Sequence, residues 1–458
     1  MMTLAQAAAF VPGSRVRGAP GTVFNGVSTD TRTIAAGCLF VALRGPRFDG
    51  HDYTATAVER GAAALLVERE FDLPCPQLVV ADSRRSLGML GAGWRSGFRI
   101  PVIAVTGSNG KTTVTQMIAA ILAKAHGASG GRAHWCATRG NLNNDIGVPL
   151  MLLELRSWHR AAAFELGMNH PGEIAYLAQL ARPTVGLVNN AQREHQEFMP
   201  GVEATARENA AVLDALPPDG VAVFPADDPC ASIWRRAAGT RRVLDFGLHE
   251  SAAVTANHAP RNDGTQLEIA TPAGEIAVTM KVVGEHNVRN ALAACACALA
   301  VGIAPTAIAS GLAAFTPVGG RGVREPGPDG TTLIDDTYNA NPDSVRAAID
   351  VLAAARPPRL LVLGDMGEVG ASGVAFHREI GAYAALRGIE RLFATGPLMA
   401  QAVAAFGPAG RHFEAFDDLV AAVLAALERG TTLLVKGSRF MRMERVLAAV
   451  RAAPGSGG

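Results

Sequence analysis

The sequence lacks an excess of charge of either sign. Its 458 residues include 42 lysines and arginines against 41 aspartates and glutamates, which leaves a formal net charge of +1 at pH 7. Proteins that bind nucleic acid through its phosphates usually carry a basic excess, so we expect no nucleic-acid partner. The apolar fraction of 49% and the charged fraction of 18% also exclude a disordered chain, because disordered chains are poor in residues that can be buried.

Cysteine and aromatic residues are scarce as well. The six cysteines form no Cys-x-x-Cys pair and show no regular spacing, so we expect reduced thiols in a cytoplasmic protein rather than a disulfide framework. Aromatic residues make up only 5% of the chain, whereas glycine occurs 50 times. This composition suits an α/β enzyme with many tight backbone turns.

Features of targeting and of membrane insertion are weak. The first residues show no basic stretch followed by a long apolar one, as a signal peptide would. Residues 291–315 carry no charge and are long enough to span a bilayer. However, alanine dominates the segment and Pro305 interrupts it. We therefore expect two short buried helices joined at Gly302–Pro305, and no stable membrane association.

Alternating apolar runs and helix-compatible stretches divide the chain into three α/β units. Residues 1–98 form a small unit with short apolar runs. Residues 99–317 alternate as in a doubly wound parallel sheet, with a β-hairpin expected in TQLEIATPAGEIAVTM. A hinge rich in proline and glycine, FTPVGGRG, leads to residues 318–458, a Rossmann-like unit. Helices are expected there at 343–355, 372–387, 416–428 and 439–450.

The strongest chemical signal is TGSNGKTTV, residues 106–114, which follows an apolar run and opens a helix. Gly107 and Gly110 permit a tight reversal that leaves backbone N–H groups pointing at one spot, where the helix dipole favours an anion. Lys111 adds a positive charge for the β- and γ-phosphates, and Thr112 adds a hydroxyl for Mg²⁺. An ordinary glycine turn before a helix is the alternative, but the strand–loop–helix context favours a nucleoside triphosphate.

Two further candidates follow later strands at what should be the same edge of the sheet. Glu165 ends the apolar run AAAFELG, and ligand sites in open α/β sheets form at the carboxyl edge of the strands. A carboxylate there is costly unless its charge is balanced, as a metal–phosphate site would do. His195 follows the next strand, although an isolated histidine is more often an ordinary loop or core residue.

Seven strings are spread over almost the whole chain in a fixed order: VSTDTRTIAAGCLFVALRGPRFDGHDY, TGSNGKTTV, GNLNNDIGVPLMLL, FELGMNHPGEI, GEHNVRNALAA, IDDTYNANPDS and LGDMGEVG. Together they resemble the Mur ligases, the ATP-dependent amino-acid and peptide ligases of peptidoglycan precursor synthesis. The resemblance implies a small N-terminal α/β domain for a uridine nucleotide, a central doubly wound P-loop ATPase domain and a C-terminal Rossmann-like domain.

The resemblance also implies an activity. A monomeric cytoplasmic enzyme would join D-alanyl-D-alanine to the peptide carboxylate of UDP-N-acetylmuramoyl-tripeptide through an acyl phosphate, with ATP and Mg²⁺ as cofactors. The small-molecule substrates would be its partners. Whether the third residue of the tripeptide is a diamino acid such as diaminopimelate, or lysine, stays open at this point.

The resemblance implies roles for substrate-binding residues in all three domains. The uridine nucleotide would lie at Ser28, Asp30 and Arg32, with Arg44–Gly50 nearby. The muramyl-peptide would face Asn141 and Asn143, and Asn339 and Asn341 would lie on the face of the third domain that closes over the site.

The resemblance implies an ATP site and a metal site as well. The phosphates of ATP would contact Gly107, Ser108, Asn109, Gly110, Lys111, Thr112 and Thr113. Asn287 and Asn290 would read the adenine edge, since an amide offers both a donor and an acceptor. Arg321 and Asp336 would reach the phosphate and the ribose. Thr112 and Glu165 would hold Mg²⁺, and His195 would hold a second Mg²⁺. The expected catalytic residues are Lys111, Glu165, His195 and Arg321.

One departure concerns a lysine that many Mur ligases carry on the helix after the histidine, carbamylated to hold the second metal. Here that stretch reads ATARENAAVL, and the aligned position is Asn209, beside Glu208. We expect Glu208 or water to take over and the second Mg²⁺ to bind more weakly. The alternative is that both side chains face solvent.

Other functions remain to be weighed against this one. One alternative is a sister ligase that adds the third amino acid, which would carry a DNP-type string in its last domain. A second alternative within the same class is a folylpolyglutamate synthase. A P-loop kinase or GTPase would carry an NKxD-type string or an aspartate ending a strand. A non-enzymatic scaffold fits poorly, because Lys111, Thr112 and Glu165 are all present.

Overall fold

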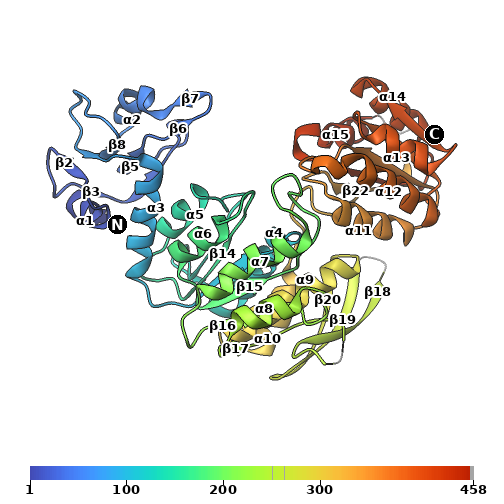
Figure 1. Ribbon diagram of the computed structural model, residues 1–458, viewed down its shortest axis with the longest axis horizontal. Helices are drawn as coiled ribbons and strands as arrows, with labels where there is room; N and C mark the ends of the chain where they lie inside the picture. The colour runs from blue at the N-terminus through green and yellow to red at the C-terminus, as the bar shows by residue number, and fades with distance from the viewer. Residues whose placement is uncertain (250, 262–263, 454–458) are drawn as a thin grey trace.

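A computed structural model describes residues 1–249, 251–261 and 264–453. Three α/β units follow one another along the chain, and in Figure 1 the N-terminal and C-terminal units lie on opposite sides of the middle one. The fold class predicted from the sequence is therefore correct. The boundaries at residues 98 and 317 stay a prediction, because helix α3 (Ser83–Ser96) contributes Leu87 and Leu90 to the N-terminal core while Trp94 packs against the core of the middle unit.

The N-terminal unit is built on a five-stranded sheet in the order β2-β9-β8-β5-β4. Strands β4, β5, β8 and β9 run parallel, and β2 is antiparallel to β9. The sheet strands are β2 (Arg15–Arg17), β4 (Gly26–Ser28), β5 (Cys38–Val41), β8 (Ala64–Val67) and β9 (Gln77–Val79). Two small pairs and three helical segments complete the unit: β1 (Met2–Thr3) with β3 (Val23–Phe24), β6 (Arg44–Gly45) with β7 (Phe48–Asp49), α1 (Leu4–Phe10), η1 (Gly50–Tyr53) and α2 (Thr54–Glu59).

The middle unit holds six parallel strands in the order β13-β14-β10-β15-β16-β17. The strands are β10 (Val102–Thr106), β13 (Trp135–Ala137), β14 (Ala161–Glu165), β15 (Val185–Val188), β16 (Val221–Val223) and β17 (Arg242–Val243). The chain leaves β10 toward β13 and returns on its other side at β15. The carboxyl ends of β14, β10 and β15 therefore frame a switch point, where open α/β sheets bind ligands.

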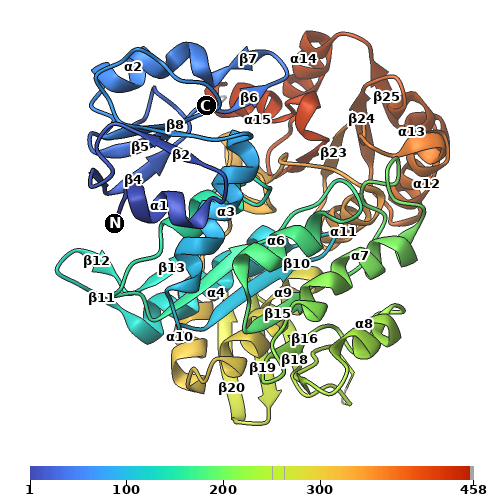
Figure 2. The same cartoon turned by 60° about the vertical axis from the view of Figure 1, so that its left-hand side comes forward.

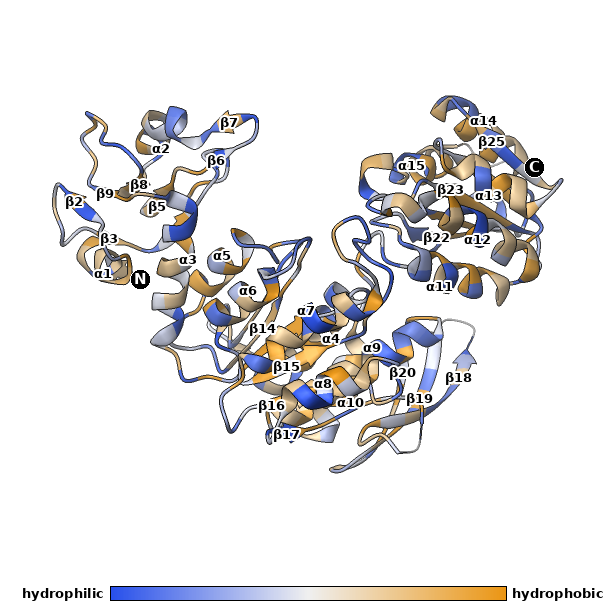
Figure 3. Cartoon of the chain, viewed as in Figure 1, coloured by the Kyte–Doolittle hydropathy of each residue, from blue (hydrophilic) through white to orange (hydrophobic). Residues whose placement is uncertain are grey.

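Helices cover both faces of this sheet, and the hydropathy colouring of Figure 3 shows the apolar strands between them. One face packs against α4 (Lys111–His126), α9 (Glu285–Ala300) and α10 (Pro305–Ala314). The other face packs against α5 (Gly147–Leu153), α6 (Glu173–Ala181), α7 (Val202–Asp214) and α8 (Ala231–Ala238). The short hairpin β11 (Ala128–Ser129) and β12 (Arg132–Ala133) lies outside the sheet.

The predicted hairpin is part of a three-stranded antiparallel sheet. Strands β19 (Gly264–Thr271) and β20 (Gly274–Met280) form the hairpin, and β18 (Thr255–Arg261) pairs with the outer side of β19. The sequence did not reveal β18, because its residues, TANHAPR, mix polar and small side chains without alternation. The uncharged segment forms α9 and α10, separated at Gly302 as expected, and no helix among the described residues meets the length and hydropathy of a membrane span.

The C-terminal unit contains a six-stranded sheet in the order β21-β22-β26-β23-β24-β25, in which only β21 is antiparallel to its neighbour. The strands are β21 (Val323–Pro326), β22 (Thr332–Asp336), β23 (Arg359–Gly364), β24 (Arg391–Thr395), β25 (Gly410–Phe413) and β26 (Thr432–Lys436). The helical segments are η2 (Pro328–Gly330), α11 (Pro342–Ala353), η3 (Gly370–Ser372), α12 (Gly373–Leu386), α13 (Met399–Phe406), α14 (Phe416–Ala426), η4 (Arg439–Met441) and α15 (Glu444–Ala452).

This unit differs from the sequence prediction in several elements. Strand β21, helix α13 and strand β25 were not predicted, because all three are short, and α13 and β25 lie beside the glycines at 396, 407 and 410. The helix expected over 439–450 is broken, since Arg442 has a φ of +53° and α15 begins only at Glu444. Helices α11, α12 and α14 lie within two residues of their predicted bounds.

Candidate nucleotide and ligation site

A cleft of about 800 Å³ lies between the carboxyl edge of the middle sheet and the C-terminal unit. Its walls come from the loop after β10, from the ends of β14 and β15, from α9 and from residues 320–348. Figure 2 shows the three units from another side. Most of the residues singled out from the sequence line this cleft.

The loop between β10 and α4 has a backbone that only small residues allow. Gly107 has a φ of +131° and Gly110 a φ of +82°. A Cβ atom on Gly107 would lie 3.0 Å from the backbone nitrogens of Asn189 and Asn190, and one on Gly110 would lie 2.3 Å from the Asn290 side-chain oxygen. Helix α4 begins at Lys111, so its free N–H groups face the loop, which is the geometry that binds phosphate.

The Lys111 ammonium bends back over this loop. It donates to the carbonyl oxygens of Gly107 at 2.6 Å and Ser108 at 3.0 Å, and it lies 3.3 Å from a Glu194 carboxylate oxygen. Glu194 is only 8% exposed. A buried carboxylate is stable there because the ammonium balances its charge.

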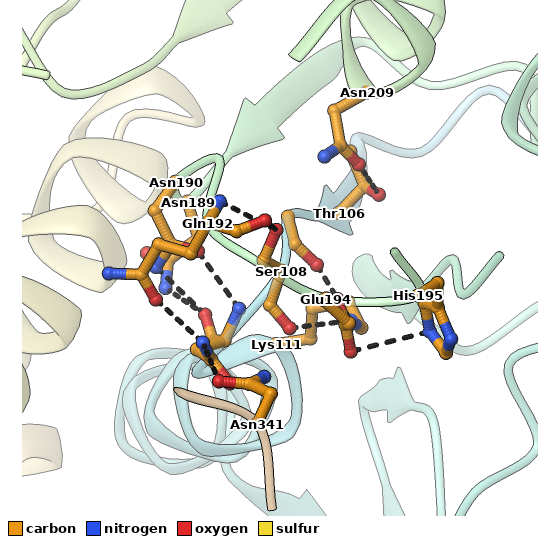
Figure 4. A network of polar contacts seen from close by, with 12 residues as sticks. Thr106, Ser108, Lys111, Asn189, Asn190, Gln192, Glu194, His195, Asn209 and Asn341 are labelled. Carbon is orange, nitrogen blue, oxygen red and sulfur yellow. Dashed lines mark hydrogen bonds and ion pairs between the residues drawn. The ribbon is translucent and has the colours of Figure 1, made fainter. Parts of the chain in front are cut away.

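Amide side chains after β15 brace the loop from the opposite side (Figure 4). Asn109 donates its backbone N–H to Asn190 at 2.9 Å and its side-chain amide to Gln192 at 2.6 Å, and Asn189 donates to the Asn109 carbonyl at 2.8 Å. The Ser108 hydroxyl accepts the Gln192 backbone N–H at 2.9 Å. The loop is therefore held in one shape by segments far away in the sequence.

Glu165 ends β14 at the cleft and is 2% exposed. One carboxylate oxygen accepts from the Asn143 amide at 2.7 Å, and the other is buried without a hydrogen-bond partner among the described residues. An orphaned buried carboxylate oxygen is costly unless a cation meets it. With the Thr112 hydroxyl lining the same cleft, these oxygen donors fit Mg²⁺.

His195 lies on the cleft between two carboxylates and has a φ of +53°. Its Nδ1 is 2.5 Å from Glu368, and its Nε2 is 3.5 Å from Glu194. Burial lowers the pKa of His195, but the two carboxylates outweigh it and raise the pKa to about 9. Among the described residues, no group of three or more acidic, histidine or cysteine side chains is arranged to hold a metal. The role of His195 toward a second Mg²⁺ stays a prediction.

Glu208, which was expected along with water as a substitute for the missing lysine, is not among the residues that line the cleft. Both Glu208 oxygens accept backbone N–H groups at the start of α6, from Gly172 at 2.9 Å and from Ile174 at 3.0 Å. The carboxylate therefore caps a helix, where the dipole favours it. Asn209 does not face solvent either: it is fully buried, and its side-chain oxygen accepts from the Thr106 hydroxyl at 2.7 Å.

The two asparagines expected to read adenine, Asn287 and Asn290, also line the cleft. Their amides are engaged with protein groups, because Asn290 donates to Asn287 at 3.2 Å and accepts from Asn189 at 2.9 Å. Asn287 itself donates to the Val283 carbonyl at 2.9 Å. In this arrangement Asn290 supports the phosphate loop at Gly110, and adenine recognition stays a prediction.

The C-terminal unit brings its predicted residues to the other wall of the cleft. The Arg321 guanidinium lies 4.0 Å from the centre of the Tyr338 ring. The buried Lys436 ammonium donates to Asp336 at 2.7 Å and to the Asn339 carbonyl at 2.8 Å. Asn341 reaches the phosphate loop directly, because it donates to the Asn109 side-chain oxygen at 2.9 Å.

The residues predicted for the uridine nucleotide lie on the N-terminal unit, away from this cleft. The Asp30 carboxylate accepts from the Arg32 guanidinium at 2.7 Å, and these hydrogen bonds hold the pKa of Asp30 at about 2. The Ser28 hydroxyl accepts the Asp30 backbone N–H at 3.2 Å. Asn141 and Asn143, which follow β13, line the cleft, and their role toward the muramyl-peptide stays a prediction.

Sequence reasoning missed the residues at 189–194 that brace the loop and pair with Lys111, and it missed Lys436. The run VNNAQRE directly follows an apolar strand, and polar residues at that position of an α/β sheet could have been recognised as site residues. Lys436 also ends an apolar strand, TLLVK, and the same rule would have found it.

Three family models match the chain: the Mur ligase family catalytic domain over residues 23–87, the Mur ligase middle domain over 105–298, and the Mur ligase glutamate ligase domain over 320–439. UDP-N-acetylmuramoyl-tripeptide–D-alanyl-D-alanine ligase from Escherichia coli (strain K12) is 40% identical over 429 residues, with 93% of each chain covered.

Solved structures agree with these matches. A crystal structure of MurF from Acinetobacter baumannii superposes with a TM-score of 0.91 at 35% identity and covers 98% of this chain and 99% of that one. The fold is also similar to MurF ligase from Thermotoga maritima in complex with ADP, at a TM-score of 0.81, 24% identity and coverage of 93% of this chain and 97% of that one.

Proposed function

The chain belongs to the Mur ligase family, and from that premise we propose how its cleft performs the reaction for which its relatives are named. The enzyme is an ATP-dependent ligase that joins D-alanyl-D-alanine to UDP-N-acetylmuramoyl-tripeptide in peptidoglycan precursor synthesis. The mechanism rests on one observation. Lys111, Glu165 and Asn341 line the same cleft, although they lie at or just after the ends of three different strands in two units.

The first step activates a poor electrophile. The terminal carboxylate of the tripeptide attacks the γ-phosphorus of ATP, which gives an acyl phosphate and ADP. Negative charge spreads over the phosphoryl oxygens during this transfer. The Lys111 ammonium and the N–H groups of residues 107–113 are positioned to stabilise that charge, and the loop needs little reorganisation because Asn109 and Ser108 are already braced.

Thr112 and Glu165 would hold Mg²⁺, as the orphaned Glu165 oxygen supports. When bound, the ion would neutralise part of the phosphate charge. Asn143 fixes the other Glu165 oxygen through its 2.7 Å hydrogen bond, and Asn141 lines the same cleft. We assign Asn141 and Asn143 to the muramyl-peptide on this basis.

The second step forms the amide bond. The amine of D-alanyl-D-alanine attacks the acyl carbon, the tetrahedral intermediate expels inorganic phosphate, and the amine proton leaves to solvent or phosphate. The dipeptide would approach from the C-terminal unit, where Arg321, Asn339 and Asn341 line the cleft. No enzyme nucleophile takes part in this scheme. Asp336 and Lys436 form the wall against which we place the ribose.

The substrate-binding roles of Ser28, Asp30 and Arg32, a monomeric state and a cytoplasmic location complete the proposal. The exposed guanidinium of Arg32 supports the first of these, because a uridine diphosphate needs cationic donors. The precursor nucleotide is a charged small molecule, which supports a location where ATP is available.

The experiment is a phosphate-release assay with ATP, UDP-N-acetylmuramoyl-tripeptide and a panel of second substrates. We expect ATP hydrolysis that depends on both the nucleotide and D-alanyl-D-alanine. Tripeptide nucleotides that end in diaminopimelate or in lysine identify the accepted third residue. Robust turnover with a free amino acid, and none with the dipeptide, would favour a sister ligase that adds the third residue instead.

A further inference from the structure

The segment Asn190–His195 lies between the phosphate loop and the C-terminal unit and contacts both of them. Asn190, Gln192 and Glu194 contact the loop, through Asn109 and Lys111. Arg193 and His195 contact the C-terminal unit, through Asp343 and Glu368. One short segment therefore contacts both partners at once.

Arg193 makes the most extensive contact of this segment with the C-terminal unit. Its guanidinium donates to Asp343, in the first turn of α11, at 2.6 Å to Oδ1 and at 3.2 Å to Oδ2, and it donates to Glu379 of α12 at 2.7 Å. Its backbone N–H also donates to Asp343, at 2.8 Å. The guanidinium lies 5.2 Å from the centre of the Phe376 ring.

These contacts differ from an ordinary surface ion pair. The Arg193 side chain is 23% exposed, as is that of Asp343, so solvent screens the charges less than at an open surface. Paired donors of a planar guanidinium also fix an orientation as well as a distance. The two carboxylates hold the guanidinium charged, since their hydrogen bonds outweigh burial and raise the pKa of Arg193.

The middle and C-terminal units meet at further points. The Asn341 amide, two residues before Asp343, exchanges hydrogen bonds with the Asn109 side chain at 2.9 Å and 3.2 Å. On the other side, the Glu197 backbone N–H donates to the Glu368 carbonyl at 3.1 Å. Arg193 lies between these two contacts and is the one that joins α11 and α12 together to the middle unit.

We propose that Arg193 is a positioning residue for the ligation, which docks the C-terminal unit against the phosphate loop and couples that docking to occupancy of the loop. The inference rests on the proposed function, since the wall that Arg193 positions is the one assigned to the incoming dipeptide. When the phosphates of the nucleotide draw the Lys111 ammonium away from Glu194, the contacts of Glu194 change, and Glu194 directly follows Arg193 in the chain. Coupling between two equilibria is reciprocal, so docking in turn affects nucleotide affinity.

The chain offers a matched control in Arg346. Its guanidinium contacts the same Glu379, at 3.1 Å, and lies 3.8 Å from the centre of the Tyr383 ring. All of these partners belong to the C-terminal unit, so Arg346→Ala removes a similar arginine without breaking a contact between units. The comparison of Arg193→Ala with Arg346→Ala therefore isolates the effect of docking.

The experiment measures three quantities in the full-length enzyme and both variants. Small-angle scattering should show a larger radius of gyration for Arg193→Ala and an unchanged one for Arg346→Ala. Calorimetry with a non-hydrolysable ATP analogue should show about fivefold or greater weakening in Arg193→Ala alone, within the range typical of coupled sites. Steady-state assays should show a raised KM for D-alanyl-D-alanine in that variant, whereas Arg193→Lys should recover part of the loss.

Equal behaviour of the two variants, or unchanged scattering and nucleotide affinity in Arg193→Ala, would overturn the proposal. The double variant Arg193→Ala with Asp343→Asn tests the pair itself, because its effects should be smaller than the sum of the two single effects. If the enzyme rejects D-alanyl-D-alanine while the scattering and calorimetry results hold, the proposed substrate fails and the docking role of Arg193 stands.

Discussion

The side-chain oxygen of Asn209 accepts a hydrogen bond from the Thr106 hydroxyl at 2.7 Å. Thr106 is the last residue of β10, directly before the phosphate loop, and Asn209 lies in the middle of α7. Both side chains are buried. The bond therefore fixes the helix that follows His195 against the strand that presents Lys111.

Replacing Asn209 by alanine should destabilise the protein rather than change its use of metal. The Thr106 hydroxyl would be left buried without its partner, which costs about 1–3 kcal/mol. Denaturant unfolding measures the loss. The double variant Thr106→Val with Asn209→Ala is the control, because removing both polar groups should recover part of the stability. Since an asparagine cannot be carbamylated, activity should not depend on added bicarbonate, and rescue by bicarbonate would contradict this assignment.

Glu208→Gln should leave the magnesium requirement unchanged. Its carboxylate accepts the Gly172 and Ile174 N–H groups at the start of α6, and loss of a charge beside a helix N-terminus costs about 0.3–1 kcal/mol. A small loss of stability with an unaltered magnesium titration is the expected result. A higher magnesium requirement would instead indicate that Glu208 is a ligand of the metal.

Lys111→Ala should lower kcat while the protein stays folded. The ammonium meets charge that grows as the phosphoryl group is transferred, and removal of one such preorganised contact typically costs roughly 10²–10³ in rate. Thermal unfolding and circular dichroism establish that the variant is folded, and phosphate release measures its turnover. Near-normal turnover would show that the phosphate loop takes no part in the reaction.

Gly110→Ala should impair ATP use far more than Gly172→Ala does. Both glycines precede a helix in the left-handed conformation, with φ values of +82° and +90°, so both substitutions bring a backbone strain of about 1–3 kcal/mol. Only at Gly110 would the new Cβ also collide, 2.3 Å from the Asn290 oxygen, whereas Gly172 faces open space. The KM for ATP in the two variants is the measurement, and equal values would show that the Asn290 contact is irrelevant to the loop.

The sequence predicts those parts of the fold and site that depend on local pattern. The phosphate loop, Glu165 and the parallel sheet follow from a glycine spacing, from residues that end apolar runs and from strand–helix alternation. Arg193 could not be found in this way, because its partners Asp343 and Glu379 lie 150 and 186 residues further along. The role of Glu208 was missed for a related reason: a helix position one residue from Asn209 points to a different neighbour, and only the packing of α6 shows which one.

The last prediction concerns stability against pH and rests on His377 of α12. This side chain is completely buried, its Nε2 accepts the Met366 N–H at 3.0 Å, and its Nδ1 donates to the Gly373 carbonyl at 2.7 Å. Burial lowers the pKa of His377 below its usual value, against weaker opposing effects of the Gly373 carbonyl and Asp365. The neutral ring is therefore the form that the folded protein holds.

The direction in which pH changes the free energy of unfolding depends on which state, folded or unfolded, binds the proton at the higher pH. As the pH falls through about 6.5, the ordinary histidine pKa, the unfolded chain takes up a proton at His377 that the folded chain refuses, so the free energy of unfolding decreases. The contribution of His377 is fully present above that pH and is lost below it, down to the folded pKa.

His377→Gln can still accept the Met366 N–H but does not titrate, and His258→Gln on the exposed edge of β18 serves as the control. Urea unfolding from pH 8 to pH 5 should show a smaller decrease for His377→Gln than for the wild type and His258→Gln, and identical slopes in all three would show that protonation of His377 does not govern this loss.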